Sequence, residues 1–373
     1  MTARGSPRSQ NSIPNSIPGR GVTAAPAGRF EQLHFEPEPD PDAFPYTDTD
    51  ADEGGAAAPR TVYLRDVSRS ALSKNRSPDI PFAVGLNPYR GCEHGCAYCY
   101  ARPTHEYLGF SAGLDFETRI LVKTGLGALL RRQLNARNWK PQVIAMSGVT
   151  DPYQPIERRL GLTRQCLQIL AEHRNPVSLI TKSRLVTRDL ELLGELARYQ
   201  AISVTLSITT LDRTLARTLE PRAAQPNARL LAVKALAEAG IPVGVNVAPV
   251  IPALNDHEIP AILEASARAG AGWANFVMLR LPHGMPELFR SWLDAHVPDR
   301  AAHVMHRVEE MRGGTMNDSR FGHRMRGSGP CAKQTRDLFD LARRRAGLAE
   351  RGPELSVRHF RRLGVGQLDL FAP

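Results

Sequence analysis

The sequence predicts an α/β protein in which a parallel sheet is covered by helices, and three observations carry that prediction. Short apolar runs with strand character begin near residue 80 and alternate with longer segments of helical period. Six strand and helix units follow one another, which is the pattern of parallel α/β folds and is short of the eight that close a full barrel. Polar residues follow several of the strands, which is where such folds place their chemistry.

The elements are expected in a fixed order along the chain. The six strands are expected at 82–86, 142–147, 177–180, 201–208, 243–250 and 273–281. Amphipathic helices are expected at 160–174, 188–199, 227–240 and 256–270, with a last helix at 332–345. Asp189, Asn227 and Asp256 lie near the expected helix starts, and Gly240 and Gly270 near the stops.

Charge is distributed unevenly over the 373 residues, whose net charge is +10. Residues 1–30 hold four Arg and no acid, whereas 31–53 hold nine acids and no Lys or Arg, so 1–75 are expected to be a disordered leader. Residues 76–311 are expected to form the barrel, and 312–373 a basic extension with thirteen basic and six acidic residues. A basic extension favours a polyanionic partner, with a solvated surface as the alternative.

Composition narrows the class of protein. With 42% hydrophobic residues the chain can bury a core, which excludes a wholly disordered protein. The first 30 residues lack the apolar run of a signal peptide, and the apolar stretch 241–255 is short and broken by prolines, so a cytoplasmic protein without a membrane span is expected. Five cysteines, three of them within eight residues, are typical of ligands and not of a disulfide framework.

Those three cysteines form a C-x3-C-x2-C array in a loop expected between the first strand and a helix. Cys92, Cys96 and Cys99 could hold three irons of a 4Fe-4S cube and leave the fourth open to a small ligand, and this is the favoured interpretation. Zinc would need His94 as its fourth ligand, and the short spacing disfavours tetrahedral geometry. Packing without a metal is the third interpretation.

The array, with Tyr98 before its last cysteine, resembles the signature of the radical SAM superfamily. The resemblance covers roughly residues 80–285 and implies a partial (βα)6 TIM-like barrel. It implies that Cys92, Cys96 and Cys99 hold a 4Fe-4S cluster whose open iron binds S-adenosylmethionine (SAM). It also implies an external electron donor and cleavage of SAM to a 5'-deoxyadenosyl radical, which abstracts hydrogen from a substrate.

Further stretches resemble the spore photoproduct lyase-like branch of that superfamily: the Cys-x-Tyr-Cys-Tyr run and residues 181–183 and 240–252. This resemblance implies that Lys182 meets the SAM carboxylate, that 147–151 lie by its amino end, and that Ser207 lies near its ribose. Ordinary polar residues at strand ends are the alternative. The expected cofactor-binding residues are Tyr98, Ser147, Gly148, Thr150, Asp151, Lys182, Ser207 and Asn246.

One departure bears on the substrate. Spore photoproduct lyases carry a hydrogen-donating cysteine just after the second strand, and residues 143–151 contain none, so reversal of a thymine dimer by that route is not expected. Tyr98 and Tyr100 match the tyrosines flanking the last cluster cysteine, which implies a hydrogen-atom relay. Packing and contact with adenine are the alternative.

The two other cysteines differ in setting. Cys166 shares an expected helix face with Leu162 and Leu170, which indicates a core residue. Cys331 follows Pro330 at an expected helix start with cations near it in sequence, a setting that favours a thiolate and makes Cys331 a candidate donor in a radical relay. A plain buried or surface thiol is the alternative.

The chain ends on a short apolar peptide after Gly364-Val-Gly. The residues Gln367, Leu368, Asp369, Leu370 and Phe371 resemble the peptide by which bacterial DNA polymerases and repair proteins bind the sliding clamp. Leu and Phe anchors would fill apolar pockets and Gln would supply a polar contact. Docking of this tail on its own domain is the alternative.

Together these observations predict a radical SAM enzyme that acts on nucleic acid, most simply on a DNA base or lesion in repair, by lyase or modification chemistry. Two alternatives remain open from the sequence. The first is radical SAM modification of RNA or of a protein side chain. The second is a metal-stabilised nucleic-acid-binding module without catalysis, which would bind zinc and would not cleave SAM.

Overall fold

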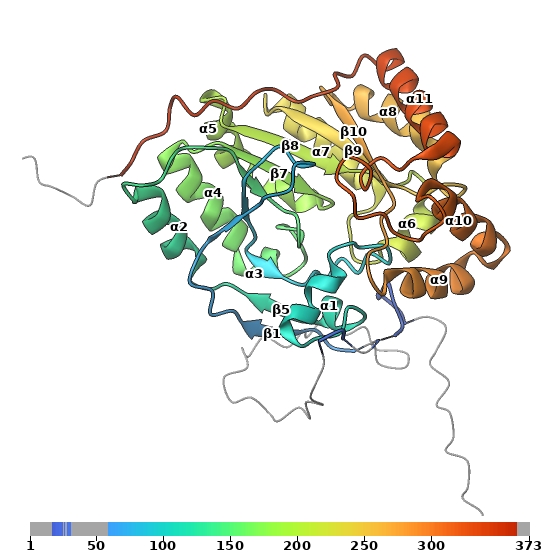
Figure 1. Cartoon of the computed structure of the whole chain (residues 1–373). Helices are drawn as coiled ribbons and strands as arrows, with labels where there is room; N and C mark the ends of the chain where they lie inside the picture. The colour runs from blue at the N-terminus through green and yellow to red at the C-terminus, as the bar shows by residue number, and fades with distance from the viewer. Residues whose placement is uncertain (1–16, 25, 27, 31–58, 364–373) are drawn as a thin grey trace, which may run out of the picture.

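A computed structural model describes residues 17–24, 26, 28–30 and 59–363. Its centre is a seven-stranded sheet in the order β10-β9-β8-β7-β6-β3-β2, with helices packed along its outer face (Figure 1). The strands are β2 (Leu72–Lys74), β3 (Val84–Leu86), β6 (Ile144–Met146), β7 (Val177–Thr181), β8 (Ile202–Ser207), β9 (Val243–Val250) and β10 (Ala274–Met278). The six from β3 to β10 pair in parallel, and β2 adds an antiparallel edge, so the predicted α/β fold class is confirmed.

Helices follow the strands in the expected alternation. They are α1 (Asp115–Thr118), α2 (Leu126–Asn135), α3 (Glu157–Leu160), α4 (Leu162–His173), α5 (Leu190–Arg198), α6 (Arg213–Leu219), α7 (Pro226–Glu238), α8 (Ile259–Arg268), α9 (Met285–His296), α10 (Pro298–Met311) and α11 (Gly329–Arg345). None of these helices, which are those of the described residues, is long and apolar enough to cross a bilayer.

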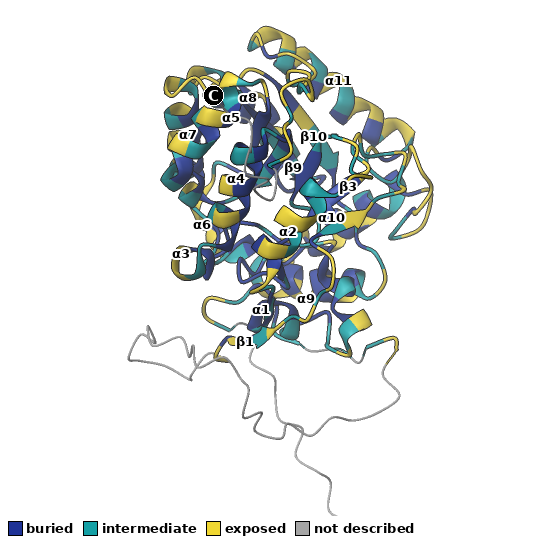
Figure 2. Ribbon diagram, turned by 90° about the vertical axis from the view of Figure 1, so that its left-hand side faces the viewer, coloured by how far each residue is buried: buried dark blue, intermediate teal, exposed yellow. Residues whose placement is uncertain are grey.

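The two faces of the sheet differ in side-chain size. Alternate strand residues such as Leu86, Met146 and Leu179 are fully buried in one apolar core with the helices, which Figure 2 shows as a dark interior beneath exposed outer helix surfaces. The residues between them point to the other face and are small: Gly85, Ala145, Ser178 and Ser203 lie in register across four strands. Because small side chains fill little volume, this inner face can accommodate a bound molecule.

A second, three-stranded sheet stands beside the barrel and carries the cysteine loop. It pairs β1 (Val62–Arg65) with β5 (Arg119–Val122) in parallel and β5 with β4 (Tyr89–Arg90) in antiparallel fashion. The first barrel strand therefore does not run directly into the cysteine loop as expected, because β4 lies between them.

The structure corrects the expected boundary of the leader. Residues 62–74, placed in a disordered segment by the sequence, form β1 and β2, because Tyr63 packs into a small apolar cluster and β2 pairs with β3. Residues 17–24 also pack on the domain, as described below. The acidic stretch 31–53 lies outside the described residues.

The three residues expected near helix starts lie at or just before the starts of α5, α7 and α8, as predicted. Asp189 makes no capping hydrogen bond, because its carboxylate binds Arg164, Arg188 and Tyr153 instead. Asn227 lies inside α7, which begins at Pro226, and Asp256 lies in a 3-10 turn before α8. The expected helix ends are confirmed, because Gly240 and Gly270 follow α7 and α8 with positive φ angles of 70° and 95°.

The basic extension packs against the barrel. Helix α11 contacts α8 and α10, and residues 356–363 then cross the opposite side of the molecule, over α5, α4 and α2 (Figure 1). Arg361 donates its backbone N–H to the carbonyl of His173 at 2.9 Å, and Leu363 donates to Asn135 at 3.0 Å. These contacts lie at the amino ends of the barrel strands. The chain therefore leaves residue 363 on the side of the barrel opposite the carboxyl ends, where the cysteine loop lies.

Candidate active site

The three cysteines of the array lie in the loop that follows β4, at the carboxyl ends of the barrel strands. Cys92 is buried, and Cys96 and Cys99 are partly exposed. Burial, Asp151 and the neighbouring thiols raise the pKa of Cys92 well above its usual value, and burial and Glu220 raise the pKa of Cys96 to about 12. Metal binding would therefore have to displace protons from these thiols.

The loop does not lead into a helix as expected. Cys99 is followed by two 3-10 turns, Arg102–Thr104 and Glu106–Leu108. Pro103 in the first turn and Gly109 after the second, with a φ of 76°, keep these turns short.

A fully buried arginine holds the middle of the loop. Arg102 donates from Nε and Nη2 to the carbonyl of Cys96, at 3.0 and 2.8 Å, and from Nη1 to the carbonyl of Gly113 at 2.9 Å. Its guanidinium also pairs with the carboxylate of Glu117, which is equally buried. The Cys96 backbone is thereby fixed by a charged group that has no access to water.

A second buried carboxylate holds the start of the loop. Glu93 accepts hydrogen bonds from the hydroxyl of Tyr63 at 2.9 Å and the backbone of Ile156 at 2.8 Å, and pairs with Arg222 at 3.3 Å. Its own N–H donates to Gln154 at 2.9 Å. These partners come from β1 and the segments before α3 and after α6, so the cysteine loop is tied to three separate parts of the chain.

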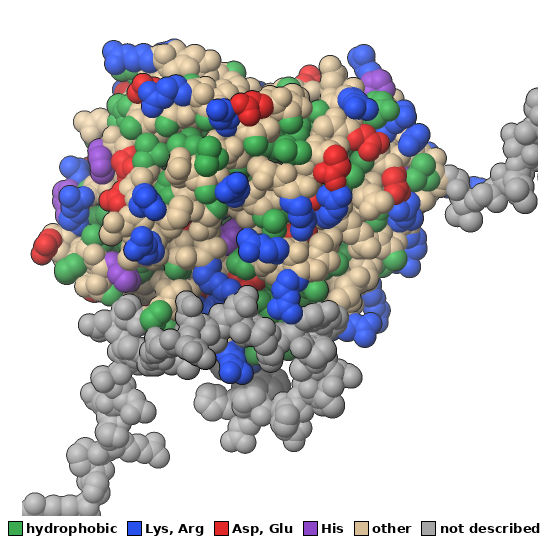
Figure 3. Space-filling view, turned by 180° about the vertical axis from the view of Figure 1, so that it is seen from behind, with side chains coloured by type: hydrophobic (Ala, Val, Ile, Leu, Met, Phe, Trp, Pro, Cys, Tyr) green, Lys and Arg blue, Asp and Glu red, His purple; other side chains and the backbone are tan. Residues whose placement is uncertain are grey.

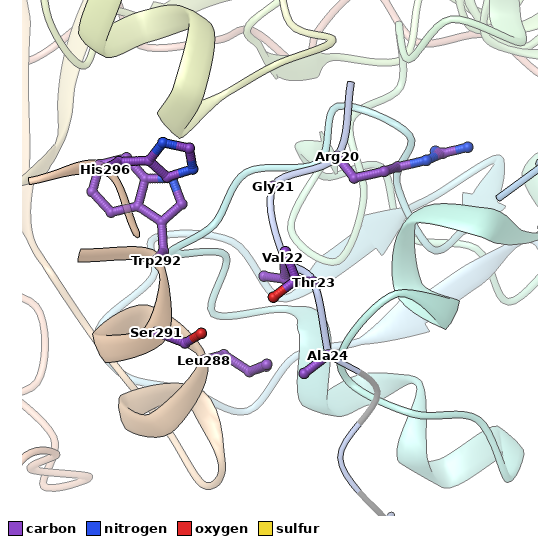
Figure 4. Close-up of a pocket in the computed structure, with 9 residues that line it drawn as sticks. All are labelled: Arg20, Gly21, Val22, Thr23, Ala24, Leu288, Ser291, Trp292 and His296. Carbon is purple, nitrogen blue, oxygen red and sulfur yellow. The ribbon is translucent and has the colours of Figure 1, made fainter. Parts of the chain in front are cut away.

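Residues 17–24, here called the N-terminal strap, pass directly over the loop. Gly21 donates its N–H to Glu117 at 3.1 Å, and Leu114 donates to the carbonyl of Ala24 at 3.2 Å. On its other side the strap forms a shallow groove with α9, lined by Leu288, Ser291, Trp292 and His296 (Figure 4). The strap therefore joins the cysteine loop to α9.

Gly21 has no room for a side chain, and this gives a first testable prediction. A Cβ at this position would lie 1.5 Å from the carbonyl oxygen of Gly95 in the loop. The substitution Gly21→Ala is expected to displace the strap and to lower both the thermal midpoint and the iron bound per chain after anaerobic reconstitution. Gly194→Ala is the control, because a Cβ there meets nothing within 4 Å, and it should stabilise α5 by about 0.5–1 kcal/mol. Equal iron content and midpoint in Gly21→Ala and the wild type would refute this role of the strap.

The structure brings Asp151 and Lys182 together at the ends of β6 and β7. The carboxylate of Asp151 accepts from Thr181 Oγ1 at 2.7 Å and from the backbone N–H of Lys182 at 2.8 Å, and lies 3.4 Å from Nδ1 of His94. Burial opposes ionisation, yet His94 and these hydrogen bonds lower the pKa of Asp151 to about 2. Asp151 thus orients the strand ends and the loop, and Nδ1 of His94 faces this carboxylate.

The remaining residues expected at the end of β6 form a strained turn. Ser147 and Gly148 have φ angles of 153° and 116°, which few residues with side chains adopt. Thr150 is buried, and its hydroxyl donates to the carbonyl of Gly91 at 2.6 Å. Thr150 therefore fixes the residue before Cys92, and the backbone of 147–148 faces the site.

Lys182, Ser207 and Asn246 lie on three neighbouring strands, as expected. Ser207 and Asn246 are register partners in β8 and β9, and Lys182 follows β7. Asn246 in β9 and Lys182 directly after β7 are half-exposed although the two strands are central, so they line the inner face. The ammonium of Lys182 lies 5.7 Å from the centre of the Tyr98 ring.

Tyr98 and Tyr100 have opposite environments. Tyr98 is buried. Its hydroxyl donates to the carboxylate of Glu220, and the same hydroxyl oxygen lies 3.3 Å from Thr209 Oγ1. Tyr100 is 47% exposed and donates its hydroxyl to the carbonyl of Gly148 at 2.8 Å. Tyr98 is thus enclosed by its neighbours, whereas Tyr100 stands at the open side of the loop.

The buried pair of Glu220 and Arg229 was missed by sequence reasoning. Arg229 binds Glu220 and donates to the carbonyl of Ser207 at 2.9 Å. Although burial opposes it, Arg229 and Lys182 lower the pKa of Glu220 to about 2. Neither residue lies in a recognisable motif, whereas Glu93 and Arg102, also missed, lie within and just after the cysteine array and could have been found from that position.

Cys331 does not have the environment expected for a thiolate. It lies in the first turn of α11 and packs partly against the main core, and burial raises its pKa. The charged groups near Cys331 are Arg307 and Glu310 on α10 and Asp256 before α8. Those near the cysteine loop are Asp151, Lys182 and Glu220, so Cys331 and the loop have different charged neighbours. Cys166 is fully buried in the core, in the environment that its helix face predicted. The peptide 367–371 lies outside the described residues.

The side chains of the site can be compared with the ligands that a 4Fe-4S cluster needs. Three thiols from one rigid loop interact electrostatically with one another, and the buried Oδ1 of Asn87, at the end of β3, has no hydrogen-bond partner among the described residues. Within the described parts of the chain, no three His, Cys, Asp or Glu side chains converge as ligands of a single ion would. Three cysteines at the strand ends of a partial barrel are the donor set that an iron–sulfur cluster with an open iron would need.

The comparisons with known proteins agree. Residues 86–265 match the model of the radical SAM superfamily, and the chain belongs to that superfamily. It is 39% identical over 234 residues to an uncharacterized protein of Mycobacterium tuberculosis, which covers 62% of this chain and 69% of that one. It is 33% identical over 191 residues to an uncharacterized protein of Methanocaldococcus jannaschii, covering 51% and 68%.

Solved structures show the same fold. A variant of spore photoproduct lyase matches with a TM-score of 0.54 at 16% identity, over 77% of this chain and 80% of that one. Spore photoproduct lyase in complex with a dinucleoside spore photoproduct matches with a TM-score of 0.52 at 17% identity over the same shares. The predicted likeness to this branch is confirmed at the level of the fold.

The protein is therefore a radical SAM enzyme with a 4Fe-4S cluster and SAM as its cofactors. When bound, these supply a 5'-deoxyadenosyl radical that abstracts hydrogen from the substrate. The chain's own residues position the cysteines and the strand ends. Arg102 and Glu93 hold the cysteine loop in place, and Asp151 holds the backbone at the end of β7.

Proposed function

We propose that this radical SAM enzyme acts in the cytoplasm on nucleic acid, most simply on a base or lesion of DNA, by lyase or modification chemistry in repair. The observation that carries the proposal is Arg280, whose guanidinium lies 5.1 Å from the Tyr100 ring at the open side of the cysteine loop, with Arg312 and Arg324 near Arg280. The fold similarity to an enzyme solved with a dinucleoside photoproduct adds support.

The charge of the surface supports the same partner. The nine acidic residues of 31–53 offset much of the basic charge, so the rest of the chain is more basic than the total of +10. Lys and Arg side chains are spread over the face seen in Figure 3. A phosphate backbone is the common polyanion that such a surface binds.

The second strand of the barrel limits the chemistry. Ser147 and Gly148 follow β6, where spore photoproduct lyases carry their hydrogen-donating cysteine. We therefore propose a reaction other than thymine-dimer reversal through a cysteine at this point. Tyr100 is the better placed relay candidate, and Cys331 would require a path from α11 to the loop.

Anaerobic reconstitution with iron and sulfide, followed by dithionite reduction, tests the proposal. The expected result is an EPR signal of the reduced cluster that shifts with SAM, formation of 5'-deoxyadenosine, and stimulation of that formation by DNA above RNA or peptide at equal charge. DNA binding should weaken steeply with salt. Stimulation by RNA or peptide alone would transfer the proposal to that substrate class.

Within this function, we propose that Lys182 binds the SAM carboxylate and that Ser147, Gly148, Thr150, Asp151, Ser207 and Asn246 shape the rest of the cofactor site. Lys182→Met removes a charged hydrogen bond and is expected to weaken SAM binding by about 10- to 100-fold while the cluster remains. Titration of the EPR shift with SAM measures this. Lys234→Met, on the outer surface of α7, is the control, and equal SAM affinity in the two variants would remove Lys182 from the site.

We also propose that residues 367–371 bind the sliding clamp. Deleting Gln367 to Phe371 is expected to abolish binding to an immobilised clamp, because its Leu and Phe anchors are lost, while SAM cleavage continues. The described residues 356–363 lead the chain away from the cysteine loop, which would let both partners bind together. Unchanged clamp affinity after the deletion would exclude this peptide as the contact.

A further inference from the structure

Arg280, just after β10, points its guanidinium at the open side of the cysteine loop. Nη1 lies 3.3 Å from the sulfur of Met325, and the guanidinium carbon lies 5.1 Å from the centre of the Tyr100 ring. Tyr100 follows Cys99 directly and reaches the carbonyl of Gly148 at the end of β6. Arg280 and Tyr100 therefore span the opening between the last barrel strand and the second one.

Arg280 lacks the partner that a half-buried arginine usually has. Among the described residues no carboxylate forms a salt bridge with it, and its buried Nε has no hydrogen-bond partner. Its neutral contacts, a thioether and an aromatic ring, leave the donors of the guanidinium fork largely unused. A half-buried cation in this state is suited to an anionic ligand.

Two more arginines stand close behind it. Arg312 donates to the carbonyl of Leu279, and at 2.9 Å to that of Arg324, and its Nε is also buried without a partner. Arg324 pairs with Asp79 and donates to Ser77. Burial and, after it, the nearby Arg280 lower the pKa of Arg312 to about 10, although Asp318 acts in the opposite direction.

An aromatic residue extends this surface outward. Phe321 is 57% exposed, and the guanidinium of Arg324 lies 4.7 Å from its ring centre. The ion pair between Arg324 and Asp79 joins two segments of the chain. The exposed Arg326 lies in the segment of Arg324, and the exposed Arg76 lies in the segment of Asp79. Cations interleaved with exposed aromatic rings match a polynucleotide strand, whose phosphates repeat beside stackable bases.

We propose that Arg280 binds a backbone phosphate of the nucleic-acid substrate and so places the adjoining nucleotide beside Tyr100, over the cysteine loop, with Phe321 available to stack on a neighbouring base. This inference rests on the proposed function, because it presumes a nucleic-acid substrate. Arg280 could bind a carboxylate in the same way as a phosphate, so the carboxylate of SAM is the competing ligand at this position. Lys182, on the other side of the site, is the residue proposed above for that group.

The test compares Arg280→Ala with Arg268→Ala in the full-length, anaerobically reconstituted protein. Arg268 is the matched control, because it lies on the outer surface of α8 and pairs with Glu264. Binding of a fluorescent single-stranded DNA is measured over a range of salt concentrations, and SAM binding is measured by the EPR shift. Arg280→Ala should weaken DNA binding about tenfold and lower the slope of log affinity against log salt by about one, and Arg268→Ala should do neither.

Further variants separate the possible outcomes. Arg280→Lys keeps the charge and should recover the salt slope but not all of the affinity, because the planar fork is lost. Lys182→Met should show the reverse pattern, with weakened SAM binding and unchanged DNA binding. Phe321→Ala should weaken binding of DNA with less effect on the salt slope, since stacking is not electrostatic.

Three outcomes would overturn the inference. If Arg280→Ala weakens SAM binding and leaves DNA binding unchanged, Arg280 holds the SAM carboxylate. If the wild type binds DNA and Arg280→Ala binds it equally well with its iron content intact, this inference fails while the proposed function stands. If the wild type binds neither DNA nor RNA, the proposed function itself fails, and the inference with it.

Discussion

Replacing Cys96 by Ala is expected to reduce cluster-bound iron and 5'-deoxyadenosine formation to background. Three thiolates are the minimum that holds a cube with one open iron, and two would leave a second iron without a protein ligand. The fold should survive, because the backbone of Cys96 is fixed by Arg102 and its side chain is partly exposed. Iron and sulfide analysis, the EPR signal and product chromatography measure the loss.

Cys166→Ala is the matched control for this loss. Cys166 is fully buried in the core and its loss should cost about 1 kcal/mol of the free energy of unfolding while iron content stays at the wild-type level. If Cys96→Ala kept a SAM-responsive EPR signal, the assignment of the cysteine array as the cluster ligands would be wrong.

Arg102→Ala is expected to destabilise the protein by about 3–5 kcal/mol, because it leaves the buried carboxylate of Glu117 without its counter-ion. It also frees the carbonyl of Cys96, so iron should be lost from whatever fraction remains folded. Urea unfolding of the protein without its cluster measures the first effect, and iron content after reconstitution measures the second.

An exposed ion pair supplies the comparison for Arg102. Lys333 pairs with Asp337 at 2.7 Å on the surface of α11, and Lys333→Ala should change the free energy of unfolding by no more than about 0.5 kcal/mol. Replacing both members of the buried pair, as in Arg102→Met with Glu117→Gln, should recover part of the lost stability, since no unpaired charge is then buried. A cost for Arg102→Ala as small as that for Lys333→Ala would refute the proposed role of this pair.

The sequence predicted the barrel well because the signal is local and repeated. The strands at 177–180 and 243–250 were placed within a residue of β7 and β9, since β-branched runs bounded by polar residues leave little choice. The strands β1 and β2 were missed, because each has four residues or fewer and depends on pairing with a partner distant in the chain. The sequence also gave no sign that residues 17–24 pack over the cysteine loop.

The sequence by itself determined the class of chemistry. Ligand type and spacing in 92–99 are covalent properties of a short stretch, so Cys92, Cys96 and Cys99 could be predicted as cluster ligands without knowing the fold around them. The alternation of strands and helices likewise placed Lys182, Ser207 and Asn246 at neighbouring strand ends, because parallel strands share one edge.

Only the tertiary structure decided how the loop is held and which side of the site is open. Glu117, Glu220 and Arg229 have no motif, and their roles follow from being buried beside opposite charges, a property that only the folded chain shows. The same holds for Arg280, whose neighbours Tyr100 and Met325 are 180 and 45 residues away in sequence. Burial of a charge and the identity of its partners are long-range properties, which sequence spacing does not encode.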